Sequence, residues 1–456
     1  MKELAKEYNI SYKRRHFIQQ IVDKSYNQYY NCHMNNYLNR IYDKVLKDKL
    51  SIFGAVLVEG PKWCGKSTTA EQLAKSVIYM QDPSKREQNE LLARSDASTF
   101  LKSEPPLLID EWQIIPFIWD AIRFEVDRRR LEGQFILTGS TTPIDISQIS
   151  HSGTGRISRL LMRPMSLFES NDSDGSISLK SLFEYKSNVS GKVNKNIDDL
   201  AFVLCRGGWP LACLRNDLES LKLVYEYYNG LINVDMSRVD NVIRDPRKVD
   251  LLLKSYARNV STECSVETMR NDMMSLEDNT LNAQTIVSYL KALANIFVIE
   301  ELEAWNPNLR SKTIIRSSNT RHFVDPSIAV ASLSLGPKDL INDMKYFGYL
   351  FEDLCIRDLR IYSDLLDAKV YHYLDKSGLE CDAVIHRRNG DYALVEIKMY
   401  SSDGIEEGAQ NLIKLKNKID TDNMSEPKFL AVLTASPISY QREDGVFVIS
   451  IFSLGP

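Results

Sequence analysis

The sequence predicts an α/β protein with two separate α/β domains and a mainly helical segment between them. From Phe53 to about residue 140, short apolar runs alternate with helical patterns, which is the order of elements that builds a parallel sheet covered by helices. A helical block begins at Asp250, and a second set of strands and helices begins at Tyr346. The length of 456 residues agrees with this division, because one hydrophobic core rarely serves so long a chain.

The composition is that of a folded globular protein and indicates no narrower class. Hydrophobic residues make up 43% and charged residues 26% of the chain, which are ordinary values for folded globular domains. The formal net charge is −4, so nucleic-acid binding requires a local basic surface. The seven cysteines include no C-x-x-C pair, which suits a reducing compartment. Because no stretch resembles a signal peptide or reaches the ~18 apolar residues of a membrane span, we expect a cytoplasmic protein without a membrane contact.

The first domain, residues 46–170, follows a polar helical arm at residues 1–45. The buried strands that we expect in it are Ala55–Val58, Val77–Met80, Leu107–Ile109 and Phe135–Leu137. Beyond it, stretches rich in Ser, Asn and Asp surround a modest helix at Leu179–Tyr185. We interpret residues 171–245 as a lid or linker.

Two further segments follow, at residues 246–335 and 336–456. In the first, helices lead to the β-branched stretch Phe297–Leu302, a turn and a strand at Thr313–Arg316, and this order predicts a winged helix. In the second we expect the order α-β-β-β-α-β, from the segments Tyr346–Tyr362, Lys369–Leu374, Glu380–His386, Tyr392–Lys398, Ile405–Ile419 and Lys428–Leu433.

A phosphate-binding motif follows the first predicted strand. Gly60–Ser67 has the form G-x-x-x-x-G-K-S and precedes a helix-forming segment, which is the context that a P-loop requires. Its glycines let backbone N–H groups converge on a phosphate, Lys66 neutralises the β and γ oxygens of ATP, and the Ser67 hydroxyl is a ligand for Mg²⁺. We therefore expect the nucleotide to be bound by Gly60, Pro61, Lys62, Trp63, Cys64, Gly65, Lys66, Ser67 and Thr68.

Asp110 and Glu111 end the third strand and predict hydrolysis rather than binding alone. Asp110 would hold Mg²⁺ directly or through water, and Glu111 would polarise the attacking water. Ser140 follows the next strand, where it, or alternatively Thr138, senses the γ-phosphate or orients water; the other interpretation is that Ser140 only caps the strand. Of the arginines at 156, 159 and 163, we assign Arg156 to stabilise transition-state charge, in cis or from a neighbouring subunit, with a surface salt bridge as the alternative.

Several motifs together resemble one family. They are G-P-K-W-C-G-K at 60–66, L-L-I-D-E-W-Q at 107–113, I-L-T-G-S at 136–140, G-R-I-S-R-L-L-M-R-P-M-S-L at 155–167 and R-G-G-W-P at 206–210. From about Tyr37 onward the chain is similar to prokaryotic AAA+-like P-loop ATPases with a C-terminal domain of unknown function, DUF4143. The resemblance implies an AAA+ core, a winged-helix segment and a C-terminal α/β domain with a restriction-endonuclease-like fold.

A second group of chemistry-bearing residues lies on two adjacent predicted strands. Asp382 precedes a hairpin turn, and Glu396 and Lys398 follow it in E-x-K spacing on one face of their strand. This pattern resembles the PD-(D/E)-x-K nuclease motif, although Cys381 stands where that motif has proline. We expect Asp382, Glu396 and Glu352, from the preceding helix, to bind Mg²⁺, and Lys398 to activate or position water.

The segment around 285–293 has the spacing of a recognition helix, with Gln284, Ser288 and Lys291 on its outer face. The hairpin beyond it carries basic side chains that would contact phosphates of DNA or RNA: Arg310, Lys312, Arg316, Arg321 and His322. A helical connector with solvated charges is the alternative interpretation.

Two functions from different classes follow. One is an ATPase whose cycle controls a nucleic-acid-binding, Mg²⁺-dependent nuclease-like C-terminal half. The other is an ATP-dependent switch or scaffold, in which the nuclease-like fold is inert and binds a protein or nucleic-acid partner. A component of a toxin, antitoxin or phage-defence system is a third, more distant class, and oligomerisation stays open.

Overall fold

The computed structural model describes residues 37–140, 152–185, 189–236, 239, 242, 244–274, 282–306, 318–419 and 424–456. Arg40–Pro456 is one compact unit, distinct from Met1–Asn39. Most of the predicted N-terminal arm, residues 1–36, lies outside the described residues. The last residues of the predicted arm, from Ile41 onward, form the first part of helix α2 (Ile41–Leu50).

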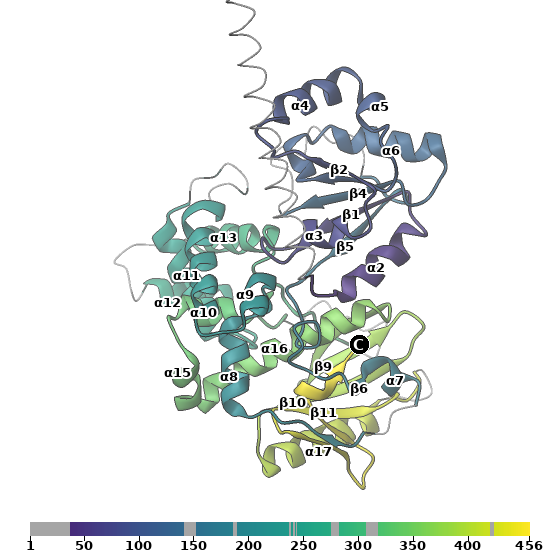
Figure 1. Ribbon diagram of the computed structural model, residues 1–456. Helices are drawn as coiled ribbons and strands as arrows, with labels where there is room; N and C mark the ends of the chain where they lie inside the picture. Colours follow the sequence, from purple (N-terminus) through teal and green to yellow (C-terminus); the bar gives the residue numbers. More distant parts are fainter. Residues whose placement is uncertain are drawn as a thin grey trace, which may run out of the picture. The chain divides into compact units, whose positions relative to one another are not determined.

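A five-stranded parallel sheet follows α2 (Figure 1). Its order is β2-β3-β4-β1-β5, so the strand before the P-loop lies in the interior of the sheet. The four predicted strands are present, with bounds within two residues, and β5 is an additional strand. The elements are β1 (Ala55–Glu59), α3 (Lys66–Glu71), β2 (Ser76–Tyr79), α4 (Arg86–Ser95), α5 (Ala97–Phe100), β3 (Leu107–Asp110), the 3-10 turn η1 (Trp112–Ile114), α6 (Ile118–Arg129), β4 (Phe135–Gly139) and β5 (Ile157–Leu161).

Helices cover both faces of this sheet, and alternate strand residues belong to opposite cores. Val56 and Val58 of β1 join the apolar side chains of α2 and α3, whereas Ala55 and Leu57 join those of α5 and α6. Successive side chains on a strand point to opposite faces, so a strand covered on both sides is apolar throughout. This is why the sequence shows continuous apolar runs here rather than an alternation.

Residues 197–342 are mainly helical. α8 begins at a capping box, in which Asn196 and Asp199 each bond the other's backbone, and it ends at Gly207, whose φ is 69°. The elements are α8 (Ile197–Arg206), α9 (Pro210–Arg215), α10 (Ser220–Gly230), the π-helical turn η3 (Leu231–Asp235), α11 (Pro246–Arg258), α12 (Val266–Met274), α13 (Ala283–Asn295), α14 (Ser327–Ser332) and α15 (Pro337–Asn342).

After α13 the chain forms two isolated antiparallel bridges, Ile299 with Phe323 and Leu302 with Thr320. The predicted first arm of the hairpin, Phe297–Leu302, is therefore paired, but with residues 320–323. The predicted second strand, Thr313–Arg316, lies outside the described residues.

The C-terminal domain has the predicted order α-β-β-β-α-β and further strands. Its elements are α16 (Met344–Asp364), β8 (Ala368–Leu374), β9 (Glu380–Arg387), β10 (Tyr392–Lys398), α17 (Ser402–Lys418), β11 (Leu430–Thr434), β12 (Ile438–Gln441), β13 (Phe447–Ser450), the 3-10 turn η6 (Ile451–Ser453) and β14 (Leu454–Gly455). The larger sheet has the order β7-β12-β13-β11-β10-β9-β8, and β14 pairs with β6.

Part of the segment interpreted as a lid or linker belongs to this domain. β6 (Ile177–Ser178) pairs with β14, and β7 (Gly191–Lys192) pairs with β12. Between them, α7 (Leu179–Phe183) places Phe183 edge-on against Phe429, with ring centroids 5.1 Å apart. β6 and β7 therefore complete the C-terminal sheets.

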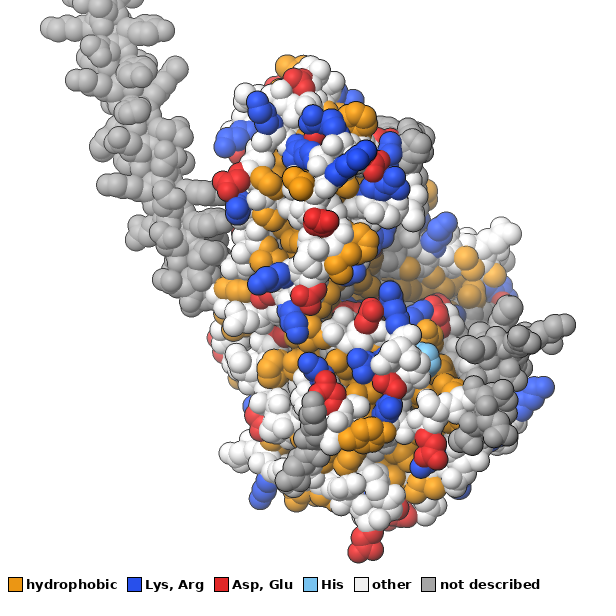
Figure 2. All heavy atoms as spheres, turned by 90° about the vertical axis from the view of Figure 1, so that its right-hand side faces the viewer, with side chains coloured by type: hydrophobic (Ala, Val, Ile, Leu, Met, Phe, Trp, Pro, Cys, Tyr) orange, Lys and Arg blue, Asp and Glu red, His pale blue; other side chains and the backbone are white. Residues whose placement is uncertain are grey.

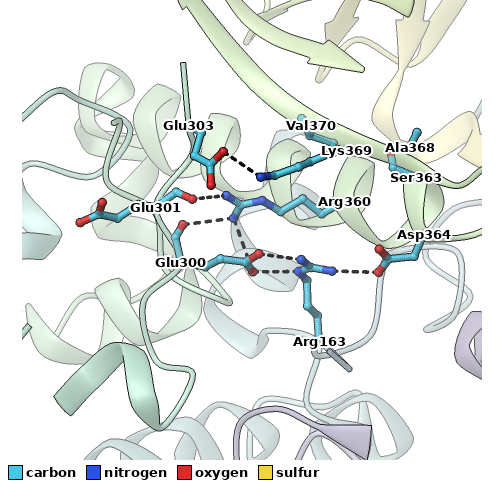
Figure 3. Close-up of a pocket in the computed structure, with 10 residues that line it drawn as sticks. All are labelled: Arg163, Glu300, Glu301, Glu303, Arg360, Ser363, Asp364, Ala368, Lys369 and Val370. Atoms are coloured by element: carbon cyan, nitrogen blue, oxygen red, sulfur yellow. Dashed lines mark hydrogen bonds and ion pairs between the residues drawn. The ribbon is translucent and has the colours of Figure 1, made fainter. Parts of the chain in front are cut away.

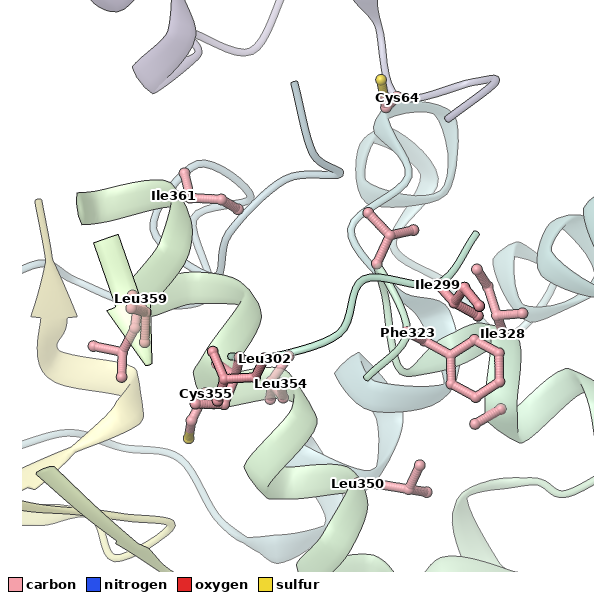
Figure 4. Close-up of a cluster of buried hydrophobic side chains, with 14 of the residues drawn as sticks. Cys64, Ile299, Leu302, Phe323, Ile328, Leu350, Leu354, Cys355, Leu359 and Ile361 are labelled. Atoms are coloured by element: carbon pink, nitrogen blue, oxygen red, sulfur yellow. The ribbon is translucent and has the colours of Figure 1, made fainter. Parts of the chain in front are cut away.

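Helix α16 joins the domains through a shared apolar core. We call the paired stretches 299–302 and 320–323 the bridged segment. Figure 4 shows Leu350, Leu354 and Leu359 of α16 in the same buried cluster as Leu302 and Phe323 of this segment. The cluster also includes Cys64 of the P-loop. Among the helices of the described ranges, none has the length and apolarity needed to cross a membrane.

Truncating Phe351 tests this core. Its side chain is 0% exposed in the middle of α16, so Phe351→Ala should lower the free energy of unfolding by about 3–5 kcal/mol through lost burial and a new cavity. Denaturant titration checks this against Met344→Ala, a site 47% exposed at the start of the same helix. Equal effects of the two substitutions would contradict the burial of α16.

Candidate functional site

The P-loop connects β1 to α3 at the carboxyl edge of the parallel sheet. Gly65 caps α3 with a φ of 95°, and a Cβ on Gly60 would lie 2.1 Å from the Met162 carbonyl oxygen, so both positions require glycine. The unbonded N–H groups in the first turn of α3 provide an anion site. Lys66 Nζ lies in the loop and donates to the carbonyl oxygens of Gly60 at 3.0 Å and Pro61 at 2.7 Å.

The parallel register brings Asp110 to the same edge. Asp110 of β3 pairs with Thr138 of β4, and Thr138 pairs with Val58 of β1. Asp110 Oδ1 accepts hydrogen bonds from Ser67 Oγ at 2.5 Å and Thr138 Oγ1 at 2.6 Å. Hydroxyl and carboxylate oxygens are the donors that Mg²⁺ prefers, so Ser67 and Asp110 fit the metal that the sequence predicts.

Glu111 follows in the left-handed region, with φ 56° and ψ 49°. The side-chain amide of Gln113 donates to its carboxylate. Burial raises the pKa of Glu111, against the attraction of Lys66. A fixed carboxylate with a raised pKa is suited to take a proton from water.

Gln113 also contacts the site, although the sequence motifs do not predict a role for it. Gly139 leaves space for it, because a Cβ there would lie 2.7 Å from Gln113 Oε1. Its presence in the motif that contains Asp110 and Glu111 was the only sequence signal.

Ser140 and Arg156 lie at opposite ends of the sheet. Ser140 is buried just beyond β4, at the P-loop edge, although Thr138 makes the contact with Asp110. Arg156 directly precedes β5, whose Ile157 pairs with Ala55 at the start of β1. Its guanidinium pairs with Asp127 at 2.8 Å. Because the P-loop follows the other end of β1, the expected action of Arg156 in cis is wrong, and an action in trans stays a prediction.

Helical residues outside the sheet also contact the P-loop. Lys62 Nζ lies 2.5 Å from Asp235 Oδ1 of η3, and the rings of Trp63 and Tyr227 are 5.9 Å apart. These contacts connect the loop to α10 and η3, which the sequence did not indicate.

The predicted cluster on β9 and β10 forms, with Lys398 between two carboxylates. Ala383 pairs with Val395, which places Asp382 beside Glu396. Lys398 Nζ is 2.6 Å from Glu396 Oε2 and 3.5 Å from Asp382 Oδ2. The backbone N–H of Ile397 also donates to Asp382 Oδ2 at 2.6 Å.

This cluster does not fit the predicted Mg²⁺ site. Glu396 is 0% exposed, and α17 packs so closely that a Cβ on Gly408 would lie 3.3 Å from Glu396 Cβ. Burial raises the pKa of both Glu396 and Glu352, and nearby Asp382 adds to each shift. Within the described ranges, no group of three or more His, Cys, Asp or Glu side chains is arranged to hold a metal ion. We therefore derive no metal-dependent step from these carboxylates.

The predicted nucleic-acid contacts differ between α13 and the bridged segment. Gln284, Ser288 and Lys291 are exposed on α13, as expected. In contrast, Arg321 pairs with Glu301, and His322 is 0% exposed with Nδ1 2.9 Å from Asp353 Oδ1. The expectation that Arg321 and His322 grip phosphates is wrong, because both are engaged within the protein. The other predicted contacts, Arg310, Lys312 and Arg316, lie outside the described residues.

Basic side chains on the face shown in Figure 2 are interspersed with acidic ones. On α6, for example, Arg128 and Arg129 both pair with Glu125. This mixture differs from the continuous basic surface that binding to a phosphate backbone favours.

Arg163 joins the end of the parallel sheet to the C-terminal half (Figure 3). Its guanidinium lies 2.6 Å from Glu300 Oε1 and 2.9 Å from Asp364 Oδ2, while Arg360 donates to the Glu301 carbonyl oxygen at 2.9 Å. These groups line a cavity of about 240 Å³ together with Glu303 and Lys369, which also pair. Each cation that lines the cavity pairs with a carboxylate of the lining. We therefore interpret the cavity as part of the contact between domains rather than as a ligand site.

Comparisons with known proteins assign three domains to the chain. A model described as an AAA domain matches residues 53–171, a domain of unknown function (DUF8612) matches 197–339, and a domain of unknown function (DUF4143) matches 347–454. The P-loop sheet lies within the segment that the AAA model matches. The DUF8612 match crosses the boundary predicted between the linker and the winged-helix segment. No curated protein matches the chain.

Solved structures of archaeal proteins are similar to parts of the chain. The Walker-type ATPase PABY2304 of Pyrococcus abyssi is 17% identical, with a TM-score of 0.42, over 66% of this chain and 97% of that one. The Aeropyrum pernix Orc1 protein in complex with DNA is 10% identical, with a TM-score of 0.27, over 66% and 93%. The Pyrococcus furiosus Hef helicase domain is 12% identical, with a TM-score of 0.19, over 90% and 95%.

The pair between Arg163 and Glu300 predicts a pH-dependent contribution to stability. Burial alone raises the pKa of Glu300, but the attraction of Arg163 and Arg360 is larger and lowers it from 4.5 to about 2. A lowered folded-state pKa gives stability above the unfolded value that is lost as pH falls toward the folded value. We expect Glu300→Gln to be less stable than wild type at neutral pH and the gap to shrink between about pH 5 and pH 2. Urea titrations across this range check it, and a gap that does not change with pH would contradict the pairing.

Proposed function

We propose that the chain binds ATP with Mg²⁺ and hydrolyses it at the carboxyl edge of the AAA sheet. The observation that carries this proposal is the convergence of four groups at that edge: Lys66, Ser67, Asp110 and Glu111. Mg²⁺, when bound by Ser67 and Asp110, neutralises phosphate charge. The AAA domain match supports use of a nucleotide.

Each side chain has a separate task in this proposal. Lys66 exchanges its bonds to the loop carbonyls for bonds to phosphate oxygens, so its charge is already in place. Glu111, oriented by Gln113, accepts a proton as water attacks the γ-phosphate. Thr138 holds Asp110 in position.

We also propose that the nucleotide state controls the C-terminal half. The supporting contacts begin at the P-loop, where Lys62 pairs with Asp235, and continue after β5, where Arg163 pairs with Glu300 and Asp364. A shift of the loop on binding phosphate acts on both contacts, because packed interfaces change between discrete arrangements. Binding of DNA or RNA by α13 is the finer form of this proposal, supported by the exposed polar side chains of Gln284, Ser288 and Lys291.

Two substitutions separate binding from hydrolysis. Lys66→Ala should weaken ATP binding and abolish turnover, whereas Glu111→Gln should retain ATP and lower turnover by about 10²-fold or more, because it keeps the phosphate contacts and loses the base. Equilibrium binding of a fluorescent ATP analogue and a phosphate-release assay check both. Loss of binding in Glu111→Gln, or normal turnover in Lys66→Ala, would contradict the assignment.

A second candidate function is a switch whose nuclease-like site is inert. The observation that favours it is the enclosure of Glu396 beneath α17, with Lys398 already paired to Glu396 and Asp382. A scissile phosphate and a metal would both have to displace these contacts. In this form ATP governs the docking of a protein or nucleic-acid partner.

If the chain is a switch, Asp382, Glu396 and Lys398 stabilise the fold and do not cleave nucleic acid. DNA or RNA incubated with the chain and Mg²⁺ or Mn²⁺, with or without ATP, should be cut no faster than by Asp382→Ala. Lys398→Ala should lower the free energy of unfolding by about 3–5 kcal/mol, because it leaves the buried Glu396 without its counter-ion. Gel assays and denaturant titrations measure the two effects. Cleavage that Asp382→Ala and Lys398→Ala abolish would overturn the inert switch in favour of a nuclease.

A further inference from the structure

A buried arginine outside the P-loop motif holds the loop by its backbone. Arg40, the residue before α2, is 5% exposed. Its Nη1 donates to the Cys64 carbonyl oxygen at 2.7 Å, its Nη2 to the Arg163 carbonyl oxygen at 2.8 Å, and its Nε to Glu169 Oε1 at 2.9 Å. One planar guanidinium therefore ties the P-loop to the segment that follows β5.

The contact with Cys64 fixes the direction of the next N–H group. A trans peptide is planar, so its C=O and the N–H of the following residue point to opposite sides. The Cys64 carbonyl accepts from Arg40, so the N–H of Gly65 points away from Arg40. Converging N–H groups of this kind form the nest that binds phosphate.

Glu169 fixes the Arg40 guanidinium in place and balances its charge. Its Oε1 also accepts from the backbone N–H of Ile41 at 2.8 Å, and its Oε2 accepts from the N–H of Ser166 at 2.8 Å. Both partners of the ion pair are nearly inaccessible to solvent, so the charges need each other and lose little to screening. Arg40 also lies directly beside Gly65, since a Cβ there would be in ordinary contact with Arg40 Nη1 at 3.5 Å.

We propose that Arg40 is a positioning residue for nucleotide binding: it orients the Cys64–Gly65 peptide so that the Gly65 N–H faces the phosphates of ATP. This inference rests on the proposed ATP site. Arg40 does not touch the nucleotide, and it acts on the ground state and the transition state alike. Its loss should therefore raise KM and leave kcat nearly unchanged.

Steady-state ATP hydrolysis by the full chain and its Arg40→Ala and Arg40→Lys variants tests the proposal. Lysine keeps the charge for Glu169 but lacks the planar fork needed to hold both carbonyls. We expect KM for ATP to rise roughly tenfold to a hundredfold in both variants, the effect of losing one hydrogen bond to a charged group. Millimolar guanidinium ion should lower KM again in Arg40→Ala, because it restores the missing group.

Arg206→Ala is the matched control. Arg206 is also a buried arginine with one acidic partner, Asp172 at 2.6 Å, but it makes no contact with the P-loop among the described interactions. It should lose stability as Arg40→Ala does, with KM unchanged and no response to guanidinium. A wild-type KM in folded Arg40→Lys, or an equal rise in Arg206→Ala, would overturn the role of Arg40. Absence of binding and turnover in the wild-type chain would instead overturn the ATP site itself, and the Arg40 proposal with it.

Discussion

The proposed nucleotide site depends on the parallel register of β1, β3 and β4. Only this register brings the P-loop after β1, Asp110 at the end of β3 and Thr138 in β4 to one edge of the sheet. The hydrogen bonds from Ser67 and Thr138 to Asp110 then close the site. The apolar residues that bury the strands on both faces therefore also align the polar groups at their ends.

Buried charges connect this site to the rest of the chain. Arg40 holds the P-loop backbone, and the carbonyl oxygen of Arg163 is one of its three acceptors. The side chain of Arg163 extends to Glu300 and Asp364. Leaving a buried charge unpaired costs several kcal/mol. A movement of one partner therefore favours a movement of the others with it. Under the proposed function, these contacts are the route by which phosphate binding would act on the C-terminal half.

Local patterns in the sequence predict the strands, the P-loop and the acidic pair, because each depends on neighbours within a few residues. β5 was missed because it is an edge strand in which Ser158 and Arg159 interrupt the apolar pattern. The role of Arg40 was missed because its partners, Cys64 and Glu169, are 24 and 129 residues away.

Contacts between residues that are distant in sequence also explain the errors at the predicted sites. The spacing of Asp382, Glu396 and Lys398 correctly places them together, but spacing does not show that α17 encloses Glu396. Arg156 follows the I-L-T-G-S motif in sequence, yet it precedes β5 at the end of the strands opposite to the P-loop. In both cases the decisive fact is three-dimensional packing rather than residue type.

Hydrolysis of ATP with Mg²⁺ at this edge of the sheet is measured by phosphate release from ATP by the purified full chain, with Mg²⁺ and with the metal chelated. We expect steady release with Mg²⁺ that stops on chelation and resumes when Mg²⁺ is restored. Release at the protein-free rate under all three conditions would contradict it.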